Sequence, residues 1–138
     1  MRKVWVNGCF DVLHMGHLKL LEFASTLGDM VFVGIDSDAR IRQAKGSDRP
    51  VNDQQFRKSL LESLVYVEKV YVFDTDHQLS DYIRQLSPWQ MVIGSDYMGK
   101  KIIGAEHCDN VTFFQRIGGL STSETIKKIK NGKRAKID

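Results

Sequence analysis

The sequence predicts an α/β fold, a doubly wound parallel five-stranded sheet with helices on both faces. The first observation is that short apolar runs alternate along the chain with longer stretches of helical period. The second is the nearly continuous apolar run from Met30 to Ile35, which is typical of a parallel strand covered on both faces. The third is the length of 138 residues, which suits a single domain with a substantial core.

The elements follow in order from apolar spacing, turn residues and caps. The expected strands are Val4–Val6, Met30–Ile35, Val70–Phe73, Gln90–Ile93 and Val111–Phe114. The expected helices are Leu18–Leu27, ended by Gly28, a helix capped by Asp53 and extending to Leu64, Leu79–Leu86 and Ser121–Lys130. A polar stretch from Asp36 to Asn52 contains the longest expected loop, around residues 45–50. Ligands of such sheets bind beyond the carboxyl ends of the strands, so we expect the site in the loops that follow them.

Composition excludes several classes of protein. With 42% hydrophobic and 27% charged residues, the chain is not disordered. No apolar run approaches the roughly 18 residues of a membrane span, and no signal-peptide core is seen, so we expect a soluble, cytoplasmic protein without a membrane partner. Cys9 and Cys108 form no cluster with metal-ligand spacing, which argues against a zinc module or a disulfide framework.

The net charge of +3 is unevenly distributed. Six basic residues lie between Lys127 and Lys136, whereas residues 1–126 contain 14 basic and 16 acidic side chains. That body lacks the footprint of a nucleic-acid-binding protein, and the basic end is better explained as a solvated helix terminus. We expect a domain over residues 1–130 followed by a basic tail over residues 131–138.

The loop after the first strand, residues 7–17, contains two histidines but neither GxGxxG nor GxxxxGK[ST]. His14 and His17 are three residues apart, so they share a face at a helix start, and Gly16 between them lets a ligand approach the backbone. Imidazoles at a helix N-terminus are suited to binding a phosphate. Spacing alone supports equally well that one histidine caps the helix while the other is exposed, and a zinc site is less favoured because no third ligand is evident.

The segment GCFDVLHMGH resembles the signature of the HxGH nucleotidyltransferase superfamily, and residues 121–126, STSETI, resemble its second signature. Taken alone, Ser121 and Glu124 form a capping box; both signatures together favour the family. The resemblance implies that His14 and His17 bind the triphosphate and, with Lys45, are catalytic. It implies nucleotide binding by Gly8, Cys9, Phe10, Gly16, Arg116, Ser121, Thr122 and Ser123.

Two further segments resemble substrate loops of this superfamily. They are KGSDRPVNDQQFR, with Lys45, Arg49 and Arg57, and the GSDY sequence that contains Asp96 and Tyr97. The substrate-binding residues expected from the resemblance are Asp11, Asp38, Arg49, Arg57, Asp96 and Tyr97. Simpler explanations exist, namely a solvated basic loop, a turn capped by Asp96, and a turn stabilised by Asp11, which is also considered as a metal ligand.

The implied reaction transfers a nucleoside monophosphate from a nucleoside triphosphate to a phosphorylated small molecule, with Mg²⁺ as cofactor. The segments KGSDRPV, GSDY and IIGAE are most similar to the adenylyltransferase part of bacterial ADP-heptose synthases, which use ATP and a heptose 1-phosphate. Arg116 instead resembles a residue of the glycerol-3-phosphate cytidylyltransferases, which use CTP. A non-catalytic nucleotide-binding protein and a nucleic-acid binder are the alternatives of another class, and the two intact signatures argue against both. A homodimer is also considered.

Overall fold

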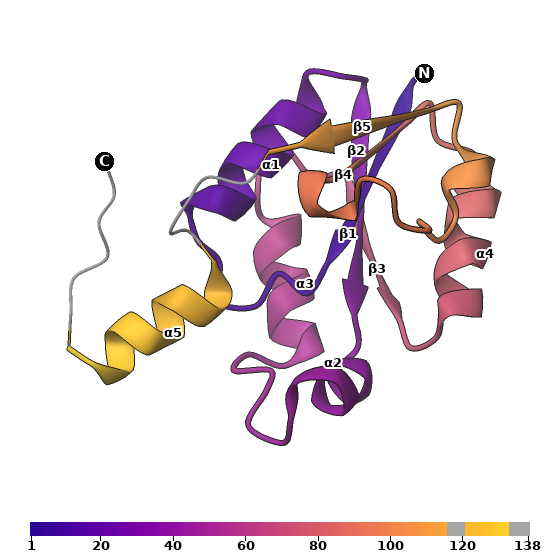
Figure 1. Cartoon of the computed structure of the whole chain (residues 1–138). Coiled ribbons are helices and arrows are strands. Elements are labelled where there is room, and N and C mark those ends of the chain that lie inside the picture. The colour runs from indigo at the N-terminus through magenta and orange to yellow at the C-terminus, as the bar shows by residue number, and fades with distance from the viewer. Residues whose placement is uncertain (116–120, 133–138) are drawn as a thin grey trace.

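The computed structural model describes residues 1–115 and 121–132, and its centre is a parallel sheet in the strand order β3-β2-β1-β4-β5 (Figure 1). The strands are β1 Lys3–Gly8, β2 Met30–Asp36, β3 Lys69–Phe73, β4 Gln90–Gly94 and β5 Asn110–Phe114. The helices are α1 Met15–Ser25, α2 Asp38–Lys45, α3 Gln54–Glu62, α4 Asp76–Leu86 and α5 Thr122–Lys130. The predicted doubly wound α/β fold is confirmed.

Two apolar layers cover the sheet, one on each face. The first contains β-strand residues such as Val6 and Val33 packed with Leu21 of α1 and Leu61 of α3. The second is built around Trp5, which packs with residues such as Ile83 of α4, and the chain between β4 and β5 completes it. Helices therefore lie on both faces, as a buried parallel sheet requires.

The structure differs from the sequence prediction in two connections. Helix α2 occupies part of the stretch that was expected to be polar loop; Ser37 caps it by accepting a hydrogen bond from the Arg40 amide at 3.2 Å. Ile41 is its buried residue, so the helix leaves almost no apolar period in the sequence. Between β4 and β5, where the sequence predicts no element, the described chain forms two short 3₁₀ helices, Ser95–Tyr97 and Ala105–His107.

Strand β1 marks the point where the strand order reverses, because β2 follows on one side of it and β4 pairs on the other. In open α/β sheets a crevice opens at this point, beyond the carboxyl ends of the two strands. Here those ends are Gly8 of β1 and Gly94 of β4. The topology alone therefore places the ligand crevice beside the loop that contains the two histidines.

A glycine on β2 makes room for the largest core side chain under this crevice. The Trp5 side chain is wholly buried. A Cβ atom on Gly34 would lie 2.4 Å from Cζ2 of Trp5, closer than real side chains approach, and in tight contact with Cε1 of Phe73 at 3.3 Å. Glycine at position 34 thus allows the indole to pack closely against β2.

Helix α5 lies away from the sheet, and the N-terminal end of this helix meets the rest of the molecule (Figure 1). None of its described residues is buried, and Ile129 is 71% exposed. The hydroxyl of Thr122, its first residue, donates a hydrogen bond to the main-chain carbonyl of Asp11. This contact holds the start of α5 against the loop that follows β1.

No helix within residues 1–115 and 121–132 is long and apolar enough to cross a membrane.

Candidate functional site

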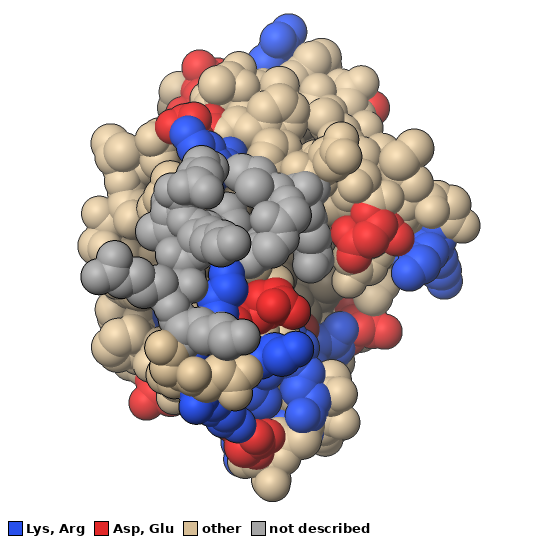
Figure 2. Space-filling model, turned by 60° about the vertical axis from the view of Figure 1, so that its left-hand side comes forward, with Lys and Arg blue, Asp and Glu red and all other residues tan. Residues whose placement is uncertain are grey.

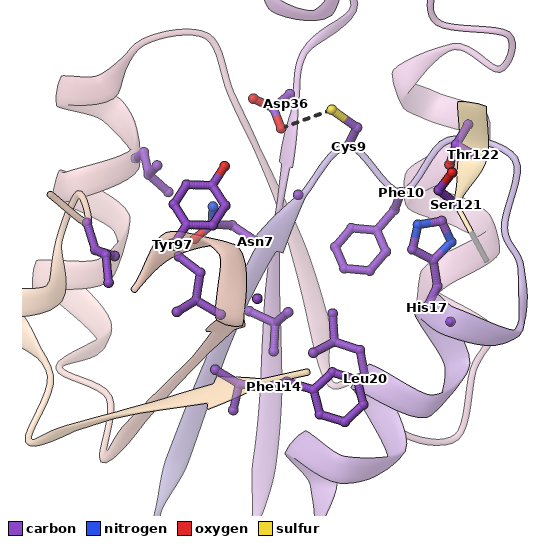
Figure 3. Close-up of a pocket in the computed structure, with 18 of the residues that line it drawn as sticks. Asn7, Cys9, Phe10, His17, Leu20, Asp36, Tyr97, Phe114, Ser121 and Thr122 are labelled. Carbon is purple, nitrogen blue, oxygen red and sulfur yellow. Dashed lines mark hydrogen bonds between the residues drawn. The ribbon is translucent and has the colours of Figure 1, made fainter. Parts of the chain in front are cut away.

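A cavity of about 460 Å³ lies at the carboxyl ends of β1 and β4, the size range of small-molecule sites. Figure 3 shows Phe10, His17, Ser121 and Thr122 on one side of it and Asn7 and Tyr97 on the other. The predicted residues that line it are Gly8, Cys9, Phe10, His14, Gly16, His17, Lys45, Tyr97, Ser121, Thr122 and Ser123. The structure therefore brings the two sequence signatures, from opposite ends of the chain, to one cavity.

The two histidines form the cap of α1. His14 Nδ1 accepts a hydrogen bond from the Gly16 amide at 3.0 Å, and His17 Nδ1 accepts one from the His14 amide at 3.2 Å. Their rings stack with centroids 3.7 Å apart. Because Nδ1 accepts in both rings, a neutral imidazole at either position carries its proton on Nε2. Capping and ligand binding are thus compatible, since the bonds that cap the helix also fix the ring orientation beside the cavity.

The loop between β1 and α1 is conformationally strained. Phe10 has φ of 51° and Val12 has φ of 48°, in the left-handed region that a β-branched residue such as valine rarely adopts. Such strain persists only where surrounding contacts determine the backbone, and it concentrates at functional sites. Asp11, between these residues, supplies the contacts.

Asp11 is 2% exposed and its carboxylate accepts three main-chain hydrogen bonds. They come from the amides of Val51 at 2.6 Å, Asn52 at 2.9 Å and Val12 at 3.1 Å. Asp11 does not line the cavity, so its placement differs from the predicted substrate contact and agrees with the turn-stabilising alternative. Its carboxylate joins the loop after β1 to the loop before α3.

Arg57 is also placed differently from the prediction. Its side chain is 1% exposed and donates from Nη1 to the carbonyls of Cys9 at 2.9 Å and Asp36 at 2.8 Å, and from Nε to that of Asn52 at 2.9 Å. Its Nη2 pairs with the Asp38 carboxylate at 2.8 Å. Arg57 and Asp38 therefore join the ends of β1 and β2 to the loop before α3, instead of facing a substrate in the cavity.

Two other predicted residues, Arg49 and Asp96, are not among the described residues that line the cavity. Arg49 is half-buried, and its Nε is buried without a hydrogen-bond partner among the described residues. Asp96 is exposed and belongs to the 3₁₀ helix Ser95–Tyr97, in which Tyr97 lines the cavity. Arg116 lies outside the described residues.

The cavity also has charged residues that sequence reasoning missed. Asp36, Arg40 and Lys101 line it together with Lys45. The Asp36 carboxylate accepts from Arg40 Nε at 2.8 Å and from the Cys9 thiol at 3.6 Å. Asp36 directly ends a buried strand, which is the signal that could have identified it. Figure 2 shows Lys and Arg side chains gathered on the lower half of one face, with Asp and Glu side chains between them.

Cys9 stays protonated in this environment. Burial and the neighbouring Asp36 raise the pKa of its thiol above the ordinary value. A neutral thiol can donate a hydrogen bond to Asp36 and is a poor nucleophile. Cys9 is therefore part of the cavity wall and not a covalent catalyst.

The wall opposite Asn7 and Tyr97 includes the N-terminus of α5. Ser121 is its cap and accepts a hydrogen bond from the Glu124 amide at 3.1 Å, as the capping-box prediction requires of the serine. Ser121, Thr122 and Ser123 also line the cavity. The N-termini of α1 and α5 thus contribute to one site, and each favours a bound anion.

The donor groups around the cavity determine how a magnesium ion could be held. Within the part of the chain that the structure describes, no group of three or more His, Cys, Asp or Glu residues is placed to hold a metal ion. The carboxylate considered from the sequence, Asp11, is buried, accepts main-chain hydrogen bonds and is not among the described residues that line the cavity. Magnesium that is held mainly by substrate phosphates, a mode common for this ion, would not require such a group of side chains.

An α/β sheet with a cavity at its switch point, flanked by two helix N-termini, is typical of proteins that bind phosphorylated ligands. Residues 5–130 match the model of the cytidylyltransferase-like family, and the chain belongs to that family. This confirms the family resemblance seen in the sequence.

Relatives and solved structures agree with this assignment. The chain is 44% identical over 127 residues to the bifunctional protein HldE of Campylobacter fetus and 42% identical over 130 residues to that of Campylobacter concisus. These matches cover 92% and 94% of this chain but 28% and 27% of the relatives. A lipopolysaccharide core biosynthesis protein from Thermoplasma volcanium shares the fold, with a TM-score of 0.69 at 23% identity over 83% of this chain and 98% of that one.

Proposed function

We propose that this protein is a nucleotidyltransferase that transfers AMP from ATP to a heptose 1-phosphate and releases pyrophosphate. The observation that carries the proposal is the convergence of two helix N-termini and the cations Lys45 and Lys101 on one cavity. This arrangement is suited to a substrate pair with several phosphate groups. The adenylyl and heptose assignment is supported by the resemblance of KGSDRPV, GSDY and IIGAE to the ADP-heptose synthases.

In the proposed reaction an oxygen of the acceptor phosphate attacks the α-phosphorus of ATP. A new phosphorus–oxygen bond forms, the bond from the α-phosphorus to the oxygen bridging it to the β-phosphorus breaks, and pyrophosphate leaves with that electron pair. A phosphate monoester has a second pKa near 6, so it is already largely dianionic at neutral pH and needs no general base. Catalysis therefore depends on positioning and on neutralising charge.

Two groups of residues that line the cavity divide these tasks. His14, His17 and the Ser121–Ser123 segment bind the triphosphate, with imidazole and hydroxyl donors added to the amides of the helix termini. Lys45 and Lys101 bind the acceptor phosphate and reduce its repulsion with ATP. Bound to the triphosphate, Mg²⁺ would add further charge neutralisation. Mg²⁺, a homodimeric assembly and a cytoplasmic location stay predictions.

The deciding experiment measures pyrophosphate release with ATP, CTP, GTP and UTP, each against heptose 1-phosphate and glycerol 3-phosphate. We expect the highest kcat/KM with ATP and heptose 1-phosphate, and little change of that preference in Arg116→Ala. A preference for CTP and glycerol 3-phosphate that collapses in Arg116→Ala would favour the cytidylyltransferase alternative. Nucleotide binding without pyrophosphate release from any pair would contradict catalysis and favour a non-catalytic nucleotide-binding protein.

A further inference from the structure

Asn7 was not expected in the site, yet it lines the cavity at the end of β1. It lies two residues after Trp5, so both side chains belong to the same face of the sheet. Figure 3 shows Asn7 on the side of the cavity away from His17, Ser121 and Thr122. That position separates it from the residues that we assign to the triphosphate.

The indole of Trp5 fixes the orientation of the Asn7 amide. Trp5 Nε1 donates a hydrogen bond to Asn7 Oδ1 at 2.9 Å. Indole nitrogen is a donor only, so the amide oxygen must face it and the amide nitrogen must point away. Trp5 is wholly buried, and its ring packs so closely on Gly34 of β2 that a Cβ atom there would lie 2.4 Å from Cζ2. The Asn7 amide nitrogen has no hydrogen-bond partner within residues 1–115 and 121–132, so it is an oriented donor beside the cavity.

A matching acceptor lies on the neighbouring strand. Gly8 pairs with Ile35 in the β1–β2 register, so Asp36 lies one residue beyond the end of β1. Its carboxylate is held by Arg40 and Cys9, and its side chain is 18% exposed. A carboxylate oxygen can accept more than one hydrogen bond, so Asp36 retains capacity for a ligand. An amide donor and a carboxylate acceptor thus stand at adjacent strand ends in one cavity.

We propose that Asn7 and Asp36 recognise hydroxyl groups of the acceptor sugar, with Asn7 Nδ2 donating and Asp36 accepting. This inference rests on the proposed function and extends it to the residues that select a polyhydroxylated acceptor. The Asp36 carboxylate only accepts hydrogen bonds and its charge is already paired with Arg40, so it suits a neutral hydroxyl group of the acceptor, whose phosphate Lys45 and Lys101 bind. The ribose of the nucleotide is the other polyol available, and it is treated as a separate arm of the test.

The test compares wild type, Asn7→Asp and Trp5→Phe, with exposed Asn131→Asp as the matched control. Asn7→Asp keeps an oxygen for Trp5 Nε1 and removes the donor; Trp5→Phe keeps the donor but lets the amide turn over. Pyrophosphate release is measured with heptose 1-phosphate and with its monodeoxy analogues. We expect wild type and Asn131→Asp to lose about tenfold in kcat/KM on one deoxy analogue. Asn7→Asp should treat that analogue and the parent alike, and Trp5→Phe should show a smaller discrimination than wild type.

This readout separates recognition from other effects of the substitution. A new negative charge or a loosened fold would lower activity on parent and analogue equally, so only a lost hydroxyl contact removes the discrimination. Discrimination unchanged in Asn7→Asp would overturn the proposal. Lost discrimination against 2′-deoxy-ATP or 3′-deoxy-ATP, in place of the deoxy sugars, would also overturn it and assign the pair to the ribose.

Failure of the proposed function gives a different pattern. If wild type releases no pyrophosphate with any sugar phosphate, the proposed function fails, and calorimetric titration with heptose 1-phosphate decides the inference. Binding to wild type that weakens about tenfold in Asn7→Asp, but not for the corresponding deoxy analogue, supports hydroxyl recognition. Equal affinity of wild type and Asn7→Asp, or no binding to either, overturns it.

Discussion

Replacing Arg57 by methionine is expected to destabilise the fold by about 3–5 kcal/mol. Methionine is similarly long and fills much of the same space, but it cannot donate to the three carbonyls or pair with Asp38. With the arginine 1% exposed, water does not readily replace it, and the Asp38 charge loses its partner. Because such a domain is stable by roughly 5–15 kcal/mol in total, this loss is a large fraction of it.

Urea denaturation followed by circular dichroism measures the change, with Arg84→Met as the matched control. Like Arg57, Arg84 pairs with an aspartate: its partner is Asp81 of the same helix, at 2.8 Å. The Arg84 side chain, however, is 57% exposed. Its loss should cost less than about 1 kcal/mol. If Arg57→Met were destabilised by no more than the control while acceptor binding was lost, the positioning role would be refuted and the substrate contact predicted from sequence restored.

Two predictions concern the chemistry of single side chains. His17→Ala should lower kcat by about a hundredfold or more because a transition-state donor is lost, and should cost about 1 kcal/mol of stability because the cap on the His14 amide is lost. Steady-state kinetics and thermal unfolding measure these two effects, and Lys19→Ala on the same helix should change neither. Near wild-type turnover of His17→Ala would remove His17 from the mechanism. Burial, with a smaller contribution from the charges of Asp109 and Glu106, raises the pKa of the Cys108 thiol to about 11. Because the thiolate is the reactive form, the rate at which Cys108 is alkylated in a Cys9→Ala variant should rise with pH up to an inflection near this value. An inflection at the ordinary value of 9.0 would contradict the burial argument.

The fold could be predicted from the sequence because its strands are strongly apolar and its helices carry a clear period. Helix α2 was missed because Ile41 is its buried residue and the rest of DARIRQAK is largely polar. The sequence signal for this helix was the capping residue Ser37, which is weak evidence within a polar stretch. The connection between β4 and β5 was left unassigned, since short 3₁₀ turns have no long period to detect.

The site could be predicted where a local motif coincides with a loop end, as for His14, His17 and the Ser121–Ser123 segment. Arg57 and Asp11 show why residue type alone is insufficient. The sequence alone does not distinguish a charged loop residue that faces a ligand from one that forms hydrogen bonds with buried main-chain groups. Asn7 was missed for the opposite reason, because its role depends on a bond to Trp5 that only the three-dimensional arrangement shows.

The hydrogen bond from Thr122 to the Asp11 carbonyl has a consequence for how the protein folds. It joins residues 111 positions apart in the chain. Contacts of such separation carry a large loop-closure entropy and form slowly compared with local structure. The strands and their nearest helices can associate before this contact exists, but the cavity then lacks one wall. Competence to bind nucleotide should therefore appear late in refolding, after the sheet has acquired its secondary structure.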